Sequence, residues 1–121
     1  MPSYPEFIPK AGGCIASKNV MSGAGRVRWM VREESVVSVD NGWRIWSHID
    51  TEEYLADSDH LQVADFNAVC ALEPALIGIY DFPVGSDLQL VDDEDGIRIF
   101  DAPTGREIPV EAFYIPEAWR G

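Results

Sequence analysis

Residues 26–54 constrain the fold more strongly than any other stretch of this chain of 121 residues. In residues 26–32, side chains alternate between two faces with the period of a β-strand. The face expected to be apolar carries Val27, Trp29 and Val31, and the mostly cationic face carries Arg26, Arg28, Met30 and Arg32. The alternation resumes in residues 43–48, where Trp43 and Ile45 oppose Arg44, Trp46 and His48. We therefore predict two antiparallel strands.

The connections beside these strands are predicted from turn and cap residues. Asn41-Gly42 accepts a positive φ at low cost, so it is the expected point of chain reversal. The valine-rich residues 35–39 leave two forms open, a tight hairpin or a longer loop. After the second strand, Asp50 is expected to cap a short helix of residues 51–56, with Glu53 in the reciprocal position of a capping box.

The other segments mix strands and short helices without a regular alternation. We expect a strand at residues 14–17, a helical turn at 18–22, and a helix capped by Asp65 with Phe66, Val69 and Cys70 on one face. A second hairpin is expected to turn at residues 92–96, whereas the apolar run 75–80 is too short to assign. The mixture predicts the α+β class: a small single domain, mainly an antiparallel sheet built from two hairpins, with two or three short helices.

We divide the chain into an irregular, proline-containing lead-in, residues 1–11, and one α+β domain, residues 12–121. The last part of that domain, residues 101–121, carries three prolines beside Phe113, Tyr114 and Trp119. We expect it to pack on the rest of the domain, because a free tail would expose these aromatic rings.

The chain is strongly acidic, with 21 Asp and Glu residues against 9 Lys and Arg residues and a net charge of −12. Such a surface repels nucleic acids and anionic membranes and attracts basic partners, although acidity also serves solubility alone. No stretch has the roughly 18 apolar residues of a membrane span, and the N-terminus does not resemble a secretory signal. Cys14 and Cys70 are expected to be buried thiols of a cytoplasmic protein.

No residue pattern indicates catalysis, a metal or a cofactor. The acidic turn at residues 92–96 fails the calcium-loop pattern, which would place Val91 and Ala102 at ligand positions. His48 and His60 match no zinc spacing, and both cysteines lie among apolar neighbours rather than beside a base. We therefore predict no catalytic residues, no metal and no cofactor.

Several motifs together resemble one protein family. In order along the chain they are GCIASK at residues 13–18, MVREE at 30–34, GWRIWS at 42–47, DTEEY at 50–54, and PVGS at 83–86 with the hairpin that follows to Phe100. This succession resembles the Imm33 immunity-protein family, also called DUF2185, over about residues 12–100. The resemblance implies a bacterial cytoplasmic protein that neutralises a cognate toxin of a polymorphic toxin system.

Three hypotheses follow. The first is a non-enzymatic inhibitor that binds its toxin through the acidic rim of the first hairpin and helix, where the candidate residues are Trp46, His48, Asp50, Glu52, Glu53, Asp57 and Asp59. The second is a binding or regulatory module with another partner, including a homodimer formed through an exposed strand edge. The third is an enzyme, which would need a deep pocket with convergent polar groups.

Overall fold

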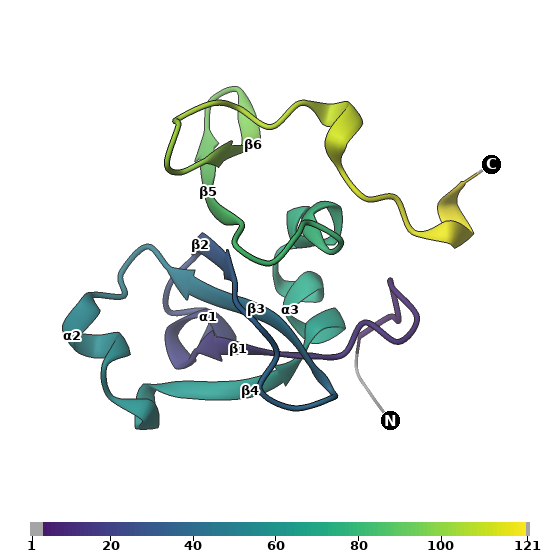
Figure 1. Ribbon diagram of the computed structural model, residues 1–121. Helices are drawn as coiled ribbons and strands as arrows, with labels where there is room; N and C mark the ends of the chain where they lie inside the picture. Colours follow the sequence, from purple (N-terminus) through teal and green to yellow (C-terminus); the bar gives the residue numbers. More distant parts are fainter. Residues whose placement is uncertain (1–3, 121) are drawn as a thin grey trace.

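Six strands form one mixed sheet in the computed structural model, which describes residues 4–120 (Figure 1). Their order across the sheet is β4-β1-β3-β2-β5-β6. They are β1 (Gly13–Ser17), β2 (Val27–Arg32), β3 (Asp40–Ser47), β4 (Leu61–Asp65), β5 (Asp87–Asp93) and β6 (Gly96–Asp101). β1 and β3 are parallel, and the other neighbouring pairs are antiparallel. The predicted α+β class is confirmed, and the two predicted hairpins, β2–β3 and β5–β6, are present.

Short helices connect the strands. The α-helices are α1 (Lys18–Ser22), α2 (Glu52–Leu55) and α3 (Phe66–Leu72), and the 3₁₀ turns are η1 (Ser58–His60), η2 (Pro74–Ile79), η3 (Val110–Ala112) and η4 (Glu117–Trp119). The helical turn at 18–22 and the helix after Asp65 are as predicted, and the Asp65 side chain accepts a hydrogen bond from the Asn67 N–H at 2.9 Å. The unassigned apolar run lies in η2, where Pro74 fits the first turn of a helix.

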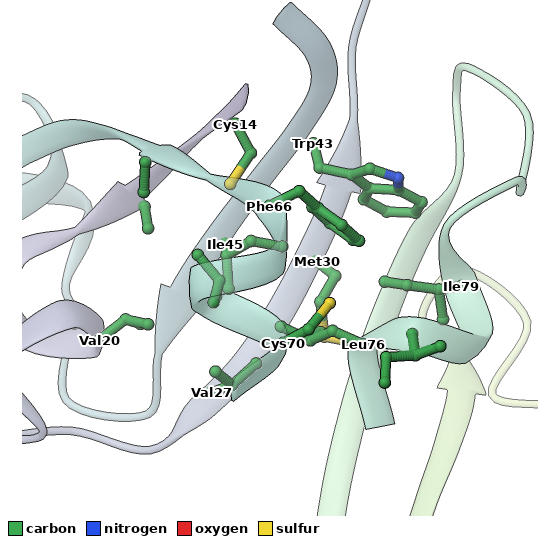
Figure 2. Close-up of a cluster of buried hydrophobic side chains, with 14 of the residues drawn as sticks. Cys14, Val20, Val27, Met30, Trp43, Ile45, Phe66, Cys70, Leu76 and Ile79 are labelled. Atoms are coloured by element: carbon green, nitrogen blue, oxygen red, sulfur yellow. The ribbon is translucent and has the colours of Figure 1, made fainter. Parts of the chain in front are cut away.

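The core lies between one face of the sheet and the two helical elements α3 and η2 (Figure 2). Trp43 and Ile45 of β3 are fully buried against Phe66 of α3 and Leu76 of η2. The Trp43 indole N–H donates to the Tyr80 carbonyl at 3.2 Å, so burial leaves no unpaired polar group on the ring. This arrangement leaves the second face of the sheet to Arg44 and Trp46, as the predicted alternation of β3 requires.

In β2, the predicted faces are correct for Val27, which is buried, and wrong from Trp29 onward. Val27 pairs with Ser47 but Trp29 pairs with Trp46, so two residues of β2 oppose one residue of β3. This β-bulge shifts the alternation by one residue. Met30 therefore points into the core at 0% exposure, whereas Trp29 lies on the second face at 36% exposure.

The chain does not reverse at Asn41-Gly42, which lies inside β3; the reversal is the longer loop of residues 33–39. Gly42 has φ of +91°, and a Cβ at this position would lie 2.1 Å from the Glu33 carbonyl oxygen. The Glu33 N–H donates to the Gly42 carbonyl at 2.8 Å. Glycine is required here because two backbone segments approach closely, not because the chain turns.

The segments near the two ends of the chain pack against α3 and against η2 with the residues that follow it. Residues 4–11 contain no helix or strand, yet Ile8 is buried and its backbone exchanges two hydrogen bonds with the Asn67 side chain, at 3.0 and 2.9 Å. Near the other end, Phe113 stacks on Phe82, and the Tyr114 N–H donates to the Gly78 carbonyl at 2.8 Å. Residues 1–3 of the predicted lead-in and residue 121 lie outside the described residues, and the division at residue 12 stays a prediction.

Candidate functional site

Residues 48–60 connect β3 to β4, and we call the last part of this connection, residues 52–60, the crossing segment. Because β1 lies between β3 and β4 in the sheet, this segment has to pass the end of β1. It contains α2 and η1 and protrudes at one side of the molecule (Figure 1). Four of the seven candidate residues lie on it and are exposed: Glu52, Glu53, Asp57 and Asp59. We call these four side chains the crossing-segment acids.

The crossing segment is held in shape by its own side chains. Thr51, not Asp50 as predicted, caps α2 and accepts a hydrogen bond from the Tyr54 N–H at 3.0 Å. Asp57 caps η1 by accepting from the Asp59 N–H at 2.9 Å. The His60 ring stacks on Tyr54 with 3.9 Å between centroids, and its Nδ1 lies 2.7 Å from the Tyr54 carbonyl oxygen. These contacts fix a short acidic segment without a hydrophobic core of its own.

Asp50 faces the protein rather than the rim. Its carboxylate accepts hydrogen bonds from the Ser47 N–H at 2.6 Å and from the Asn19 amide at 2.7 Å. Burial would raise the pKa of Asp50, but the nearby Ser17 side chain and these two donors outweigh burial and hold the pKa below its ordinary value. Asp50 therefore anchors the start of the crossing segment to β3 and α1, which explains why it does not cap α2.

Trp46 and His48 lie near the crossing segment in sequence but have partners elsewhere in the sheet. Trp46 is half-buried on the second face, where Trp29 of β2 is its direct cross-strand neighbour. The His48 side chain is exposed, and its Nδ1 accepts a hydrogen bond from the Arg26 N–H at 3.0 Å. Through this contact His48 acts as a hydrogen-bond acceptor at Nδ1, and its ring lies beside the start of β2.

A second acidic group, which the sequence analysis treated only as a turn, lies at the end of β5. The strand register brings this end close to the start of β2, and an ion pair joins Arg26 to Asp92. Asp93 accepts a hydrogen bond from the Arg98 guanidinium at 2.7 Å, which lowers its pKa below the ordinary value. Two of the four acids in residues 92–95 are thus paired with arginine.

The crossing-segment acids differ in this respect. Within residues 4–120, no Lys or Arg side chain forms an ion pair with any of them, and the His60 Nε2 lies 3.9 Å from Asp57. Their charge therefore faces solvent without compensation. Identifying this difference needs the fold, because sequence shows where acids are dense but not which arginine reaches them.

Comparison with known protein families gives a match to the Immunity protein Imm33 domain over residues 14–100. The chain belongs to this family. No curated protein and no solved structure gave a match. Membership implies neutralisation of a cognate toxin by binding, without catalysis, and confirms the family resemblance expected from the motifs.

On the second face of the sheet, the Imm33 domain also contains the Asp40 carboxylate, which is held by hydrogen bonds from other residues of the same chain. Asp40 and Arg44 of β3 form two hydrogen bonds of 2.9 Å each, and only 8% and 6% of their side chains are exposed. Asp40 further accepts from the Val36 N–H and the Gly42 N–H, at 2.9 Å each. The Arg44 guanidinium holds the pKa of Asp40 well below its usual range. The pair fixes the 33–39 loop to β3.

Other chemistry finds little support in the Imm33 domain. Cys14 and Cys70 are buried free thiols, and burial raises the pKa of each to about 12, so neither is a nucleophile at neutral pH. In the described part of the chain, residues 4–120, His, Cys, Asp and Glu side chains form no group of three with metal-binding geometry. The same residues include no helix that is long and apolar enough to span a membrane.

Proposed function

We propose that this Imm33 protein neutralises its cognate toxin by binding a basic toxin surface through the crossing-segment acids. Glu52, Glu53, Asp57 and Asp59 form the contact in this proposal. Asp50 positions the segment, whereas Trp46 and His48 have their partners at β2 and Arg26 and lie outside the proposed contact. The observation that carries the proposal is the absence, within residues 4–120, of a Lys or Arg ion pair to these four acids.

Uncompensated carboxylates suit this task for a physical reason. An acid that is already paired with arginine must lose that partner before it can bind another, whereas a solvated acid loses only water. Charges at the rim of an interface mainly accelerate association, and the effect weakens as salt screens them. The overall charge of −12 adds a long-range attraction to a basic partner. A basic toxin is therefore the expected target, whatever reaction that toxin performs.

The direct test pairs the purified protein with the toxin encoded beside it, in an inactive form. We expect a one-to-one complex whose association rate falls at least about tenfold between 50 mM and 500 mM salt. Co-expression with the active toxin should protect cells. No complex at low salt together with no protection would refute a neutralising role. If a complex forms but its association rate does not change with salt concentration, the acidic interface is refuted and neutralisation is not.

A further inference from the structure

The two edge strands of the sheet, β6 and β4, differ in whether another segment of the chain pairs with their outer side. Along β6, residues 106–108 form a partial extra strand: the Ile108 N–H donates to the Ile99 carbonyl at 2.8 Å, and Phe100 pairs with Glu107. β4 forms the opposite edge and pairs only with β1 (Figure 1). Within residues 4–120, no other segment pairs with its outer side. The chain thus covers one edge and leaves the other open.

The register of β4 shows which backbone groups this open edge presents. The Phe66 N–H donates to the Gly12 carbonyl at 2.9 Å, and the antiparallel pairing continues through Ala64 with Cys14 and Gln62 with Ala16. Since backbone groups of successive residues point to opposite sides of a strand, the groups of Leu61, Val63 and Asp65 face outward. The Leu61 N–H is already bound by the Ser58 carbonyl. The outward donors are therefore the N–H groups of Val63 and Asp65.

Four of the five residues of β4 also lack the usual protection of an edge strand. Proteins commonly guard such edges with charged side chains, proline or a bulge. Residues 61–64 are Leu, Gln, Val and Ala, the pairing with β1 is regular, and the Val63 side chain is 77% exposed. Asp57 and Asp59 precede this stretch, and Asp65, the last residue of β4, follows it. The Asp65 carboxylate accepts hydrogen bonds from the Asn67 N–H at 2.9 Å and from the Tyr4 hydroxyl at 3.0 Å. The open edge is thus a neutral stretch with exposed acids before its start and a bound carboxylate at its end.

These charges favour one occupant over another. In an antiparallel pairing of two copies about Val63, the start of each β4 would meet the end of the other, so Asp65 of one copy would lie opposite Leu61 of its mate, two residues from the mate's Asp59. Like charges at both ends, added to −12 on each copy, oppose such a dimer. An extended segment with basic residues meets the same edge with attraction, most strongly at the start of β4, where Asp57 and Asp59 form no ion pair with a Lys or Arg side chain of residues 4–120.

We propose that β4 takes up an extended, basic segment of the cognate toxin as a seventh strand of the sheet. The inference rests on the proposed function and specifies how the toxin is held. Backbone hydrogen bonds from Val63 and Asp65 supply the binding, and the crossing-segment acids select the basic residues of the segment. The crossing segment leads directly into β4, so its last acid, Asp59, is two residues from the first residue of the edge strand.

Amide hydrogen exchange measured residue by residue tests the edge directly, on the full chain with and without inactive toxin. In the free protein, the outward amides of Val63 and Asp65 should exchange fast, while those of Gln62 and Ala64 are protected by β1. In the complex, protection should appear at Val63 and Asp65. Protection at these two amides in free protein, rising with its concentration, would instead identify a homodimer and overturn the toxin as occupant.

Three substitutions complete the test. Val63→Pro removes an outward N–H at a position where an edge strand tolerates proline, so toxin binding should weaken at least about tenfold while the fold is kept. Gln62→Pro removes an N–H that bonds to β1, so this variant should damage the fold itself. Val63→Ala keeps the backbone donors, so its affinity for the toxin should stay within about threefold of the wild type. If Val63→Pro fails to fold, the exchange data decide alone. The edge proposal, but not neutralisation, would be overturned if the toxin forms a tight complex in which the edge amides stay unprotected and the folded Val63→Pro variant binds as well as the wild type. If no complex forms at all, both proposals are overturned.

Discussion

β3 and the crossing segment that follows it both carry carboxylates, but the protein uses the two sets differently. Asp40 at the start of β3 and Asp50, three residues after its end, are bound by Arg44, by an asparagine amide and by backbone N–H groups. In the crossing segment, Glu52 and Glu53 belong to the same dense acidic run of sequence yet form no ion pair within residues 4–120. The first set holds the fold together, and the second set remains available to a partner.

The comparison shows that acidic density alone does not define an interface. The turn at residues 92–95 has four consecutive acids, as many as the whole crossing segment, but Asp92 and Asp93 are paired with Arg26 and Arg98. A partner would have to compete with these arginines. What separates a binding surface from a structural one is therefore the supply of basic side chains from neighbouring strands, which depends on the order of the strands.

The largest expected effect is on stability, at Asp40. Asp40→Ala would leave the Arg44 guanidinium buried without its main partner and would free the N–H groups of Val36 and Gly42. We expect a loss of about 3 kcal/mol in the free energy of unfolding. Urea denaturation measures it. The matched control is Asp59→Ala, which removes a crossing-segment acid and should cost less than about 0.5 kcal/mol. Equal losses for the two variants would contradict the division into structural and available carboxylates.

The second expected effect is on toxin binding, for which the crossing-segment acids should matter and the carboxylates paired with arginine should not. Neutralising the crossing-segment acids (Glu52→Gln, Glu53→Gln, Asp57→Asn and Asp59→Asn together) should slow toxin association about 10- to 100-fold at low salt, with little change in stability. The control removes the same charge from the second acidic group through Asp92→Asn, Asp93→Asn, Glu94→Gln and Asp95→Asn. It should change the association rate less than about threefold, as stopped-flow fluorescence can show. Equal slowing would mean that only total charge matters.

The smallest expected effect concerns pH. The pKa of Asp40 is lower in the folded protein than in the unfolded chain, so its contribution to stability is complete above the unfolded pKa and is lost as pH falls toward the folded pKa. The stability difference between wild type and Asp40→Asn should therefore shrink by about 1 kcal/mol from pH 7 to pH 3. Urea denaturation of both proteins over this range checks it. If the difference in unfolding free energy between the two proteins does not change with pH, ionisation of Asp40 is not the source of that difference.

Sequence reasoning succeeded where one local signal decided the structure. The cap at Asp65, the acidic turn of the β5–β6 hairpin and the alternation of β3 were sufficient for their elements. It failed where a distant segment intervened. Gly42 is required by the approach of the Glu33 carbonyl, which no local pattern reveals.

The same distinction applies to β4 and to the site. β4 was not predicted, because its five residues form a strand only through pairing with β1 and show no clear alternation. Sequence located the crossing-segment acids. It did not show that Asp50 faces inward, because that orientation depends on a hydrogen bond from Asn19 in α1.

The position of β1 has a consequence for how the protein is made. It is the first strand to be synthesised, yet it ends up between β3 and β4, which follow it by more than twenty residues. Until residue 65 has emerged from the ribosome, β1 lacks at least one of its two neighbours, and its pairing depends on contacts distant in sequence, which form slowly. A nascent chain halted before β4 would therefore expose β1 along one side, so this half of the sheet is expected to assemble late and as a unit.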